Sequence, residues 1–198
     1  MQTTALALDA ATAAVLDRTV VDADFEREWV DLFSQLEYVG CRKIVKAVPY
    51  DRISLETLRH IAEEASHAFL LKSAAERMGL PERSWKDGRF SEAGWRYFQG
   101  LDRGVEASVS DRALCYPLVA AAVERRVLAL YPAWLERTKN ADIRRALTRI
   151  LAQEKRHAEL FDGTGLPSDA LATACALEER LWSDFMAALG SYRRHPGC

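Results

Sequence analysis

The stretch Glu64-Ala-Ser-His67 places a histidine three residues after a glutamate, and Glu154-Lys-Arg-His157 repeats that spacing later in the chain. Both stretches lie inside long segments whose apolar residues recur with the period of a helix. Residues three apart project from one face of a helix, so each pair can reach one ion, and two such pairs can face each other across a bundle. The repeated pattern therefore predicts a metal site inside an all-α protein.

The composition is typical of one globular domain that spans residues 1–198. The chain has 198 residues, of which 49% are hydrophobic, enough to enclose a substantial core. Its net charge of -2 argues against wholesale binding to polyanions. The stretch from Arg125 to His157 nevertheless holds nine Lys and Arg residues. Two interpretations stay open: a face that meets an acidic substrate or partner, or charges that only solvate two amphipathic helices.

Cysteine usage and the N-terminus indicate a cytoplasmic protein. The four cysteines, Cys41, Cys115, Cys175 and Cys198, form no Cys-x-x-Cys or Cys-x-x-His pattern. The first residues lack the basic start and long apolar run of a signal peptide. No apolar stretch approaches the ~20 residues that cross a bilayer, so we expect no membrane partner.

Capping residues, glycines and prolines divide the chain into five expected helices. Serine and aspartate can cap the first free backbone N–H groups of a helix, whereas Gly and Pro mark its end. On these signals the helices run from Asp22 or Asp24 to just before Pro49, from Ser54 to about Gly79, from about Asp111 to Lys139 with Pro117 and Pro132 as interruptions, from near Asp142 to Phe161, and from Pro167-Ser168 to around Gly190.

The loops between these helices predict their order in space. Short loops make the first two helices one antiparallel hairpin and the next two another. Between the hairpins, residues 80–110 hold several aromatic side chains and form a long connection, which allows a crossover. We therefore expect a four-helix bundle over about residues 22–161, one crossover between its second and third helices, and a fifth, C-terminal helix over about 168–190.

Height along the bundle selects the missing ligands, since only residues at one level can share a site. Glu64 lies ten residues after Ser54, about 15 Å along its helix. Glu37 lies eleven residues before Val48, about 16 Å from the same turn, whereas Glu28 lies about 30 Å from it. Glu37 is therefore the expected partner of Glu64.

In the second hairpin the same comparison pairs Glu124 with Glu154, whose heights agree to roughly one turn. All four glutamates interrupt apolar helix faces, where bare carboxylates would be costly. Two divalent cations would neutralise them, and oxygen-rich ligation with one imidazole per ion suits iron or manganese. The expected metal ligands are Glu37, Glu64, His67, Glu124, Glu154 and His157.

This ligand order resembles that of the ferritin-like di-iron carboxylate superfamily, in which two helices each supply a Glu and two others each supply Glu-x-x-His. The resemblance covers about residues 22–161. It implies a ferritin-like four-helix bundle that binds two iron ions, with manganese as the alternative metal. The arrangement also looks similar to the tRNA-hydroxylase branch, which has Glu-Glu-x-x-His on its second helix. The residues that match the superfamily pattern in chain order are Glu37, Glu64 with His67, Glu124, and Glu154 with His157.

The resemblance implies an oxidoreductase whose reduced metal pair activates dioxygen to hydroxylate or oxidise an organic substrate, with an electron donor as a further partner. The run Ala120-Ala-Ala122 beside Glu124 would leave room for that substrate. Two other hypotheses stay open: a ferritin-like or rubrerythrin-like protein that handles iron or peroxide, and a metal-free helical interaction module. Whichever function holds, a bundle with exposed apolar helix faces would often form a homodimer.

Three residues near the expected ligands have open roles. His60 lies one turn before Glu64, and Tyr38 follows Glu37, so either can be an outer partner of a ligand or a redox-active neighbour. Cys41 lies about one turn beyond Glu37, and we expect a buried structural cysteine there.

Overall fold

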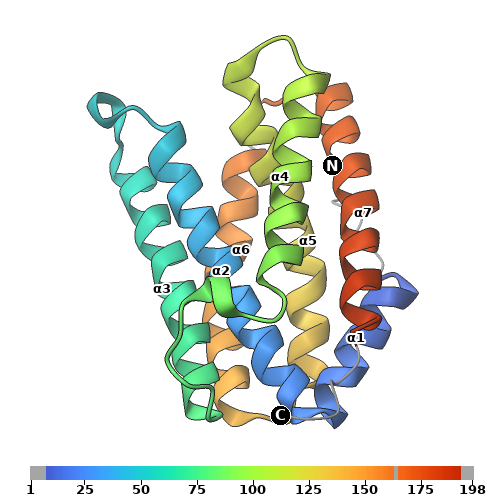
Figure 1. Ribbon diagram of the computed structural model, residues 1–198. Coiled ribbons are helices and arrows are strands. Elements are labelled where there is room, and N and C mark those ends of the chain that lie inside the picture. The colour runs from blue at the N-terminus through green and yellow to red at the C-terminus, as the bar shows by residue number, and fades with distance from the viewer. Residues whose placement is uncertain (1–7, 163–164, 193–198) are drawn as a thin grey trace.

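The computed structural model describes residues 8–162 and 165–192 (Figure 1). Within these ranges the chain forms seven α-helices and no β-strand, with three short 3-10 turns between helices. The all-α class expected from the sequence is therefore confirmed. The helices are α1 (Ala10–Val21), α2 (Ala23–Ala47), α3 (Leu55–Arg77), α4 (Ser91–Ser108), α5 (Cys115–Arg137), α6 (Ala141–Asp162) and α7 (Ser168–Gly190).

The ends of α2 and α3 follow the capping signals in the sequence. The side chain of Asp22 accepts a hydrogen bond from the backbone N–H of Phe25, which satisfies a free donor at the start of α2. The hydroxyl of Ser54 does the same for the N–H of Thr57 at the start of α3. Gly79 leaves α3 with a φ of 87°, a left-handed conformation that glycine adopts without strain.

From the sequence, Pro117 and Pro132 were expected to begin, kink or break this segment, and neither breaks α5. Pro117 lies in the first turn, where its missing N–H would have no partner in the helix. Pro132 lies inside the helix, which continues to Arg137. Residues Arg112–Leu114, expected as helix, form a separate 3-10 turn.

Two helices, α1 and α4, were not among those expected from the sequence. The connection over residues 80–110 contains α4, whose glycines lower its intrinsic helix propensity. These glycines allow close packing: a Cβ at Gly94 would lie 2.8 Å from Leu32 Cδ1, and one at Gly104 would lie 2.3 Å from Leu177 Cδ2. Contacts with α2 and α7 therefore stabilise a helix that local sequence signals do not favour.

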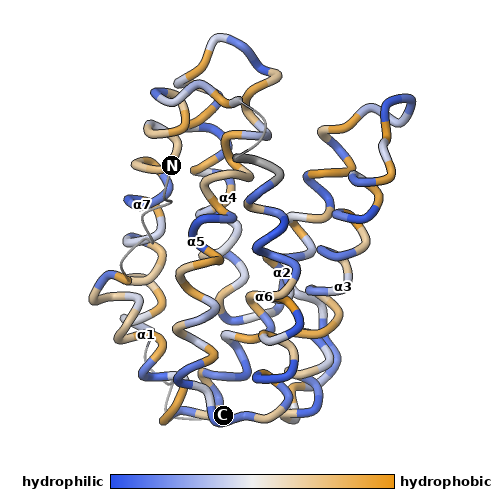
Figure 2. The backbone as a smooth tube through the Cα atoms, turned by 180° about the vertical axis from the view of Figure 1, so that it is seen from behind, coloured by the Kyte–Doolittle hydropathy of each residue, from blue (hydrophilic) through white to orange (hydrophobic). Residues whose placement is uncertain are grey.

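The helices are arranged as two hairpins with a second layer beside them (Figure 1). Helices α2 and α3 are antiparallel neighbours, as are α5 and α6, and α3 packs along α6. Helix α4 carries the chain back along the molecule, so α3 and α5 run in the same direction (Figure 1). Helix α7 packs on α4, α5 and α1. Along each helix, hydrophilic and hydrophobic residues alternate in patches, as expected for amphipathic helices (Figure 2).

A cluster of aromatic rings forms the centre of the main core and joins α2, α5 and α7. The ring of Phe33 lies 4.5 Å from that of Trp29, 5.5 Å from Trp134 and 6.5 Å from Trp182, measured between centroids. These four side chains are almost completely buried. Such large rings contribute much of the apolar area removed from water, and their tilted contacts fix how the helices are rotated.

A buried ion pair ties α5 to α7 and α4. Arg126 donates to Glu178 through Nε at 3.0 Å and through Nη2 at 2.8 Å. The hydroxyl of Tyr97 donates to the same carboxylate at 2.7 Å. The two charges are therefore enclosed together with their hydrogen-bond partners, the condition under which a buried pair is tolerated.

We expect Glu178→Ala to lower the free energy of unfolding by about 3–5 kcal/mol, because Arg126 would stay buried without a counter-ion. Urea unfolding followed by circular dichroism measures the change. Glu92→Ala is the matched control, since its ion pair with Arg96 has side chains 75% and 77% exposed. That control should change stability by no more than about 0.5 kcal/mol. If the two substitutions lower the free energy of unfolding equally, the buried Arg126–Glu178 pair does not stabilise the fold as predicted.

Candidate metal centre

The structure brings the six predicted ligands together between four helices. Helix α2 supplies Glu37 and α5 supplies Glu124, while α3 and α6 each supply one Glu-x-x-His pair. All six side chains are buried, and both imidazoles are fully enclosed. Glu28, which the height comparison rejected, lies elsewhere and accepts a hydrogen bond from Arg83 at 2.6 Å. That these residues bind metal stays a prediction.

The cluster divides into two overlapping groups of four residues. In each group, one potential ligand atom per residue lies within 4.8 Å of the corresponding atoms of the others, and Glu64 belongs to both groups. Such buried His/Glu clusters could hold metal ions. The first group is Glu37, Glu64, His67 and Glu154, and the second is His60, Glu64, Glu124 and His157.

Both predicted histidines are held from behind, so that Nδ1 faces the carboxylates. His67 Nε2 lies 2.8 Å from the amide oxygen of Gln153, and His157 Nε2 lies 2.8 Å from a carboxylate oxygen of Glu63. An acceptor at Nε2 keeps the proton there and leaves the Nδ1 lone pair for an ion. The helices thus orient both rings as metal ligands require.

The inward nitrogens have the surroundings expected of ligand atoms. His67 Nδ1 lies 2.9 Å from Glu154 Oε1, and His157 Nδ1 lies 3.3 Å from Glu64 Oε1. Despite these short distances, neither Nδ1 has the geometry of a hydrogen bond. Two ligands at right angles, each about 2.1 Å from one ion, lie about 3 Å apart. The residues present therefore fit a metal ion.

The carboxylates have strongly shifted pKa values. Burial raises the pKa of Glu37 to about 7, against the opposing effect of His67. Burial, with the charge of Glu154 added, raises the pKa of Glu124 well above its usual range. Burial would also raise the pKa of Glu64 and Glu154, but contacts with the histidines outweigh it and lower both. The four carboxylates therefore divide into two with raised and two with lowered pKa values.

The pKa values of both imidazoles are raised, which favours the protonated rings that balance the carboxylate charge. Burial lowers the pKa of His67, but the neighbouring Glu154 and Glu37 outweigh burial and raise it to about 11. Burial likewise opposes the effect of Glu154 and Glu64 on His157, whose pKa rises to about 10. Without metal, protons therefore balance the carboxylates, and a metal ion would displace those protons on binding.

Several residues around the cluster were not found from the sequence. Tyr131 donates a hydrogen bond to Glu37 from α5, whereas the sequence had singled out Tyr38. Tyr38 is 41% exposed and packs its ring on Trp85. Glu63 and Gln153 each directly precede a predicted ligand glutamate, and each reaches the histidine of the neighbouring helix. Only the packing of α3 against α6 makes them partners of the histidines.

His60 and Cys41 have clearer surroundings than the sequence allowed. His60 was expected as an outer partner or redox neighbour, and its Nε2 lies 3.4 Å from Glu64 Oε1 within the second group. Its spacing of four residues before Glu64 was the available signal. Cys41 is buried, as expected, and its Sγ donates to the backbone oxygen of Ile61 at 3.6 Å. His195, the histidine near the C-terminus that has no supporting sequence context, lies outside the described residues.

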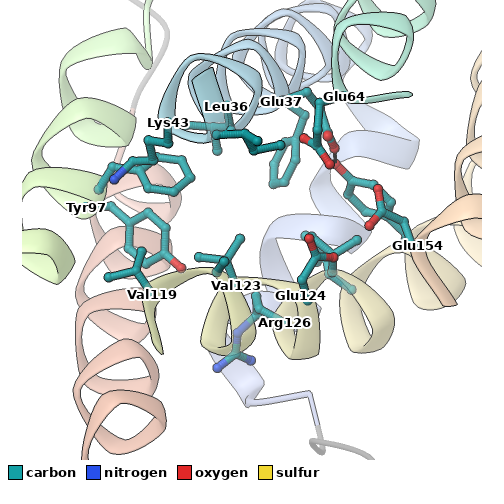
Figure 3. Close-up of a pocket in the computed structure, with 18 of the residues that line it drawn as sticks. Leu36, Glu37, Lys43, Glu64, Tyr97, Val119, Val123, Glu124, Arg126 and Glu154 are labelled. Atoms are coloured by element: carbon teal, nitrogen blue, oxygen red, sulfur yellow. Dashed lines mark hydrogen bonds between the residues drawn. The ribbon is translucent and has the colours of Figure 1, made fainter. Parts of the chain in front are cut away.

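An apolar cavity of about 80 Å³ opens onto the carboxylates (Figure 3). The close-up shows Glu37, Glu64, Glu124 and Glu154 at one end, Leu36 and Val123 along its length, and Lys43 and Tyr97 at the other end. Of the three alanines before Glu124, Ala120 lines the cavity, whereas Ala121 and Ala122 are buried in the core. A Cβ at Gly40 would lie 2.8 Å from Glu64 Oε2, so a larger residue there would require that carboxylate to move.

No protein-family model, curated protein or solved structure matches the chain. The family resemblance therefore rests on the residues and their geometry alone. What the structure establishes is a helical protein with buried His/carboxylate clusters compatible with a metal pair. Over residues 8–162 and 165–192, no helix has the length and apolar character needed to cross a membrane.

The pKa shifts determine how the stability of the metal-free protein depends on pH. Glu37, whose pKa rises on folding, holds its proton better in the folded state, so stability falls as the pH rises from 4.5 to about 7. The histidine contribution is complete below 6.5 and is lost as the pH rises through about 10 for His157 and about 11 for His67. The lowered pKa values of Glu64 and Glu154 make stability depend on pH only below pH 4.5, where it falls as the pH falls.

We therefore expect the melting temperature of the metal-free protein to fall between about pH 5 and pH 8. Glu124→Gln should raise it at pH 8 and flatten the fall, because glutamine removes a carboxyl that is protonated when folded and ionised when unfolded. A rise of more than about 3 °C, which roughly 1 kcal/mol produces in a chain of this size, is the expected result by scanning calorimetry. Glu92→Gln, at the exposed ion pair, should leave the melting temperature unchanged. If Glu124→Gln also leaves the melting temperature at pH 8 unchanged, the raised pKa of the buried Glu124 carboxyl is contradicted.

Proposed function

We propose that this protein is a ferritin-like di-iron carboxylate oxidoreductase, which activates dioxygen to hydroxylate or oxidise an organic substrate. The observation that carries the proposal is the convergence of four buried glutamates and two Glu-x-x-His histidines on one cluster. The order of these residues along α2, α3, α5 and α6 is the order found in the superfamily. The parallel run of α3 and α5 supports the same assignment (Figure 1).

The charge of the cluster supports a pair of divalent cations. Four ionised carboxylates carry four negative charges, which two divalent ions would balance, and mixed oxygen and imidazole ligation suits iron or manganese. The metals would supply the redox chemistry. Inserting one oxygen atom of dioxygen into a C–H bond also consumes two electrons and two protons and releases water, so an electron donor is part of the proposal.

The protein side chains position the centre and limit access to it. Gln153 and Glu63 hold the imidazole rings from behind, and Tyr131 fixes one oxygen of Glu37 by donating its hydroxyl proton to a hydrogen bond. Apolar side chains such as Leu36 and Val123 line the approach to the carboxylates. A site that only stored iron would gain nothing from an apolar approach, which therefore supports an organic substrate.

A polyanionic substrate, such as the RNA of the tRNA-hydroxylase branch, receives less support. Four of the basic residues between Arg125 and His157 have acidic partners in the structure. The ion pairs are Arg126–Glu178, Arg137–Asp17, Arg145–Asp142 and Arg156–Glu63. Paired charges attract a polyanion less than free ones, so we propose a substrate whose reacting part is apolar and enters the cavity.

Protein loaded anaerobically with Fe(II) should contain near two irons per chain and should consume dioxygen when exposed to it. His67→Ala/His157→Ala should lose the iron and the oxygen consumption while keeping its helical circular dichroism. Elemental analysis and an oxygen electrode measure both quantities, and Glu92→Gln serves as the control that keeps both. Iron-loaded protein that neither consumes oxygen nor reacts with peroxide would contradict the proposed chemistry, and retention of many irons per chain would indicate storage instead.

The cavity provides a second prediction for the same reaction. Val123→Phe adds a ring within the cavity and should slow the consumption of dioxygen by the iron-loaded protein several-fold, while near two irons remain bound. Val45→Phe is the matched control, because Val45 is exposed on α2. Stopped-flow oxygen mixing measures the rates. Equal rates for wild type and Val123→Phe would show that dioxygen reaches the cluster by another path.

A further inference from the structure

His60 faces the same pair of carboxylate oxygens as His157. His60 Nε2 lies 3.4 Å from Glu64 Oε1 and 3.9 Å from Glu124 Oε1. His157 Nδ1 lies 3.3 Å and 4.0 Å from the same two oxygens. The two rings lie against each other, with centroids 4.0 Å apart. Two imidazole nitrogens and two carboxylate oxygens therefore converge on one point.

The other group has a single imidazole. His67 Nδ1 lies 2.9 Å from Glu154 Oε1 and 3.4 Å from Glu37 Oε2, and its ring centroid lies 5.7 Å from that of His157. We call this group, with Glu64, the one-imidazole position, and we call His60, Glu64, Glu124 and His157 the two-imidazole position. Glu64 is common to both.

The outer partners of the imidazoles make the two positions differ further. Behind His157 stands the carboxylate of Glu63, which is itself paired with Arg156. Behind His67 stands the neutral amide of Gln153. A carboxylate acceptor increases the basicity of an imidazole ligand more than a neutral acceptor does. The two-imidazole position thus offers two imidazole nitrogens rather than one, and the ring of His157 is the more basic because Glu63 stands behind it.

We propose that His60 is a metal ligand and that the two positions are unequal, with the two-imidazole position binding its ion more tightly. This inference rests on the proposed metal pair but goes beyond it, because the Glu and Glu-x-x-His pattern contains no third histidine. Imidazole ligands suit iron and zinc, whereas carboxylate ligands suit manganese and magnesium. The metals should therefore load in sequence, and the one-imidazole position should accept manganese more readily.

Calorimetric titration of the metal-free full-length protein with Co(II), checked by elemental analysis, tests the proposal. Wild type should bind two ions in two steps of different affinity. His60→Ala should weaken the tighter step at least ten-fold, whereas His67→Ala, the same substitution on the same helix, should weaken the other step. Added imidazole should restore the lost step in His60→Ala, because a free ring can enter the space that the substitution opens and ligate the ion.

His60→Gln, which keeps a polar side chain of similar reach, guards against a variant that fails to fold, and it should also lose the tighter step. If His60→Ala binds two ions as wild type does, the inference is wrong while the proposed metal pair stands. If His60→Gln keeps both steps and imidazole restores nothing in His60→Ala, His60 only positions another ligand, and the inference is wrong. If wild type binds no Co(II), Fe(II) or Mn(II), both the inference and the proposed function are wrong.

Discussion

Four carboxylates and three imidazoles are enclosed at one level between α2, α3, α5 and α6, and their mutual charge is the constraint on which the rest of the structure depends. Removing ionised groups from water is costly, and like charges a few ångströms apart raise the cost. The folded chain compensates by mixing carboxylates with imidazoles and by supplying a hydroxyl from Tyr131. Protons can complete the balance, but divalent ions can replace them at the same place.

Holding these groups together requires helices that do not rotate. The aromatic cluster around Phe33 and Trp134 fixes α2 against α5, and Tyr131 extends from that cluster to Glu37. The buried pair of Arg126 and Glu178 attaches α5 to the second layer. A side chain on a helix moves by several ångströms when its helix turns, so the geometry of the cluster also depends on rings and ion pairs outside it.

The second layer also shapes access to the centre. Helix α4 fills the return between the hairpins, and its Tyr97 and Phe98 close the far end of the apolar cavity. Lys43 reaches over Phe98 at that end and pairs with Asp102. The segment that links the two hairpins thus supplies part of the lining of the cavity that opens onto the carboxylates. The aromatic residues that the sequence shows in this connection therefore include two, Tyr97 and Phe98, that line the cavity.

The sequence by itself determined the ends of α2, α3 and α6 and six of the seven residues of the cluster, but it placed the start of α5 too early. Caps such as Ser54 and Gly79 act locally, and the rise per residue places Glu37 rather than Glu28 beside Glu64, so no tertiary information was needed. Only the tertiary structure decided the helix α4, whose glycines fit against neighbouring leucines, and the place of His60 inside the cluster. Sequence spacing gives height along a helix, but rotation and the distance between helices come from packing, and these decide whether a nearby side chain faces the cluster or lies behind it.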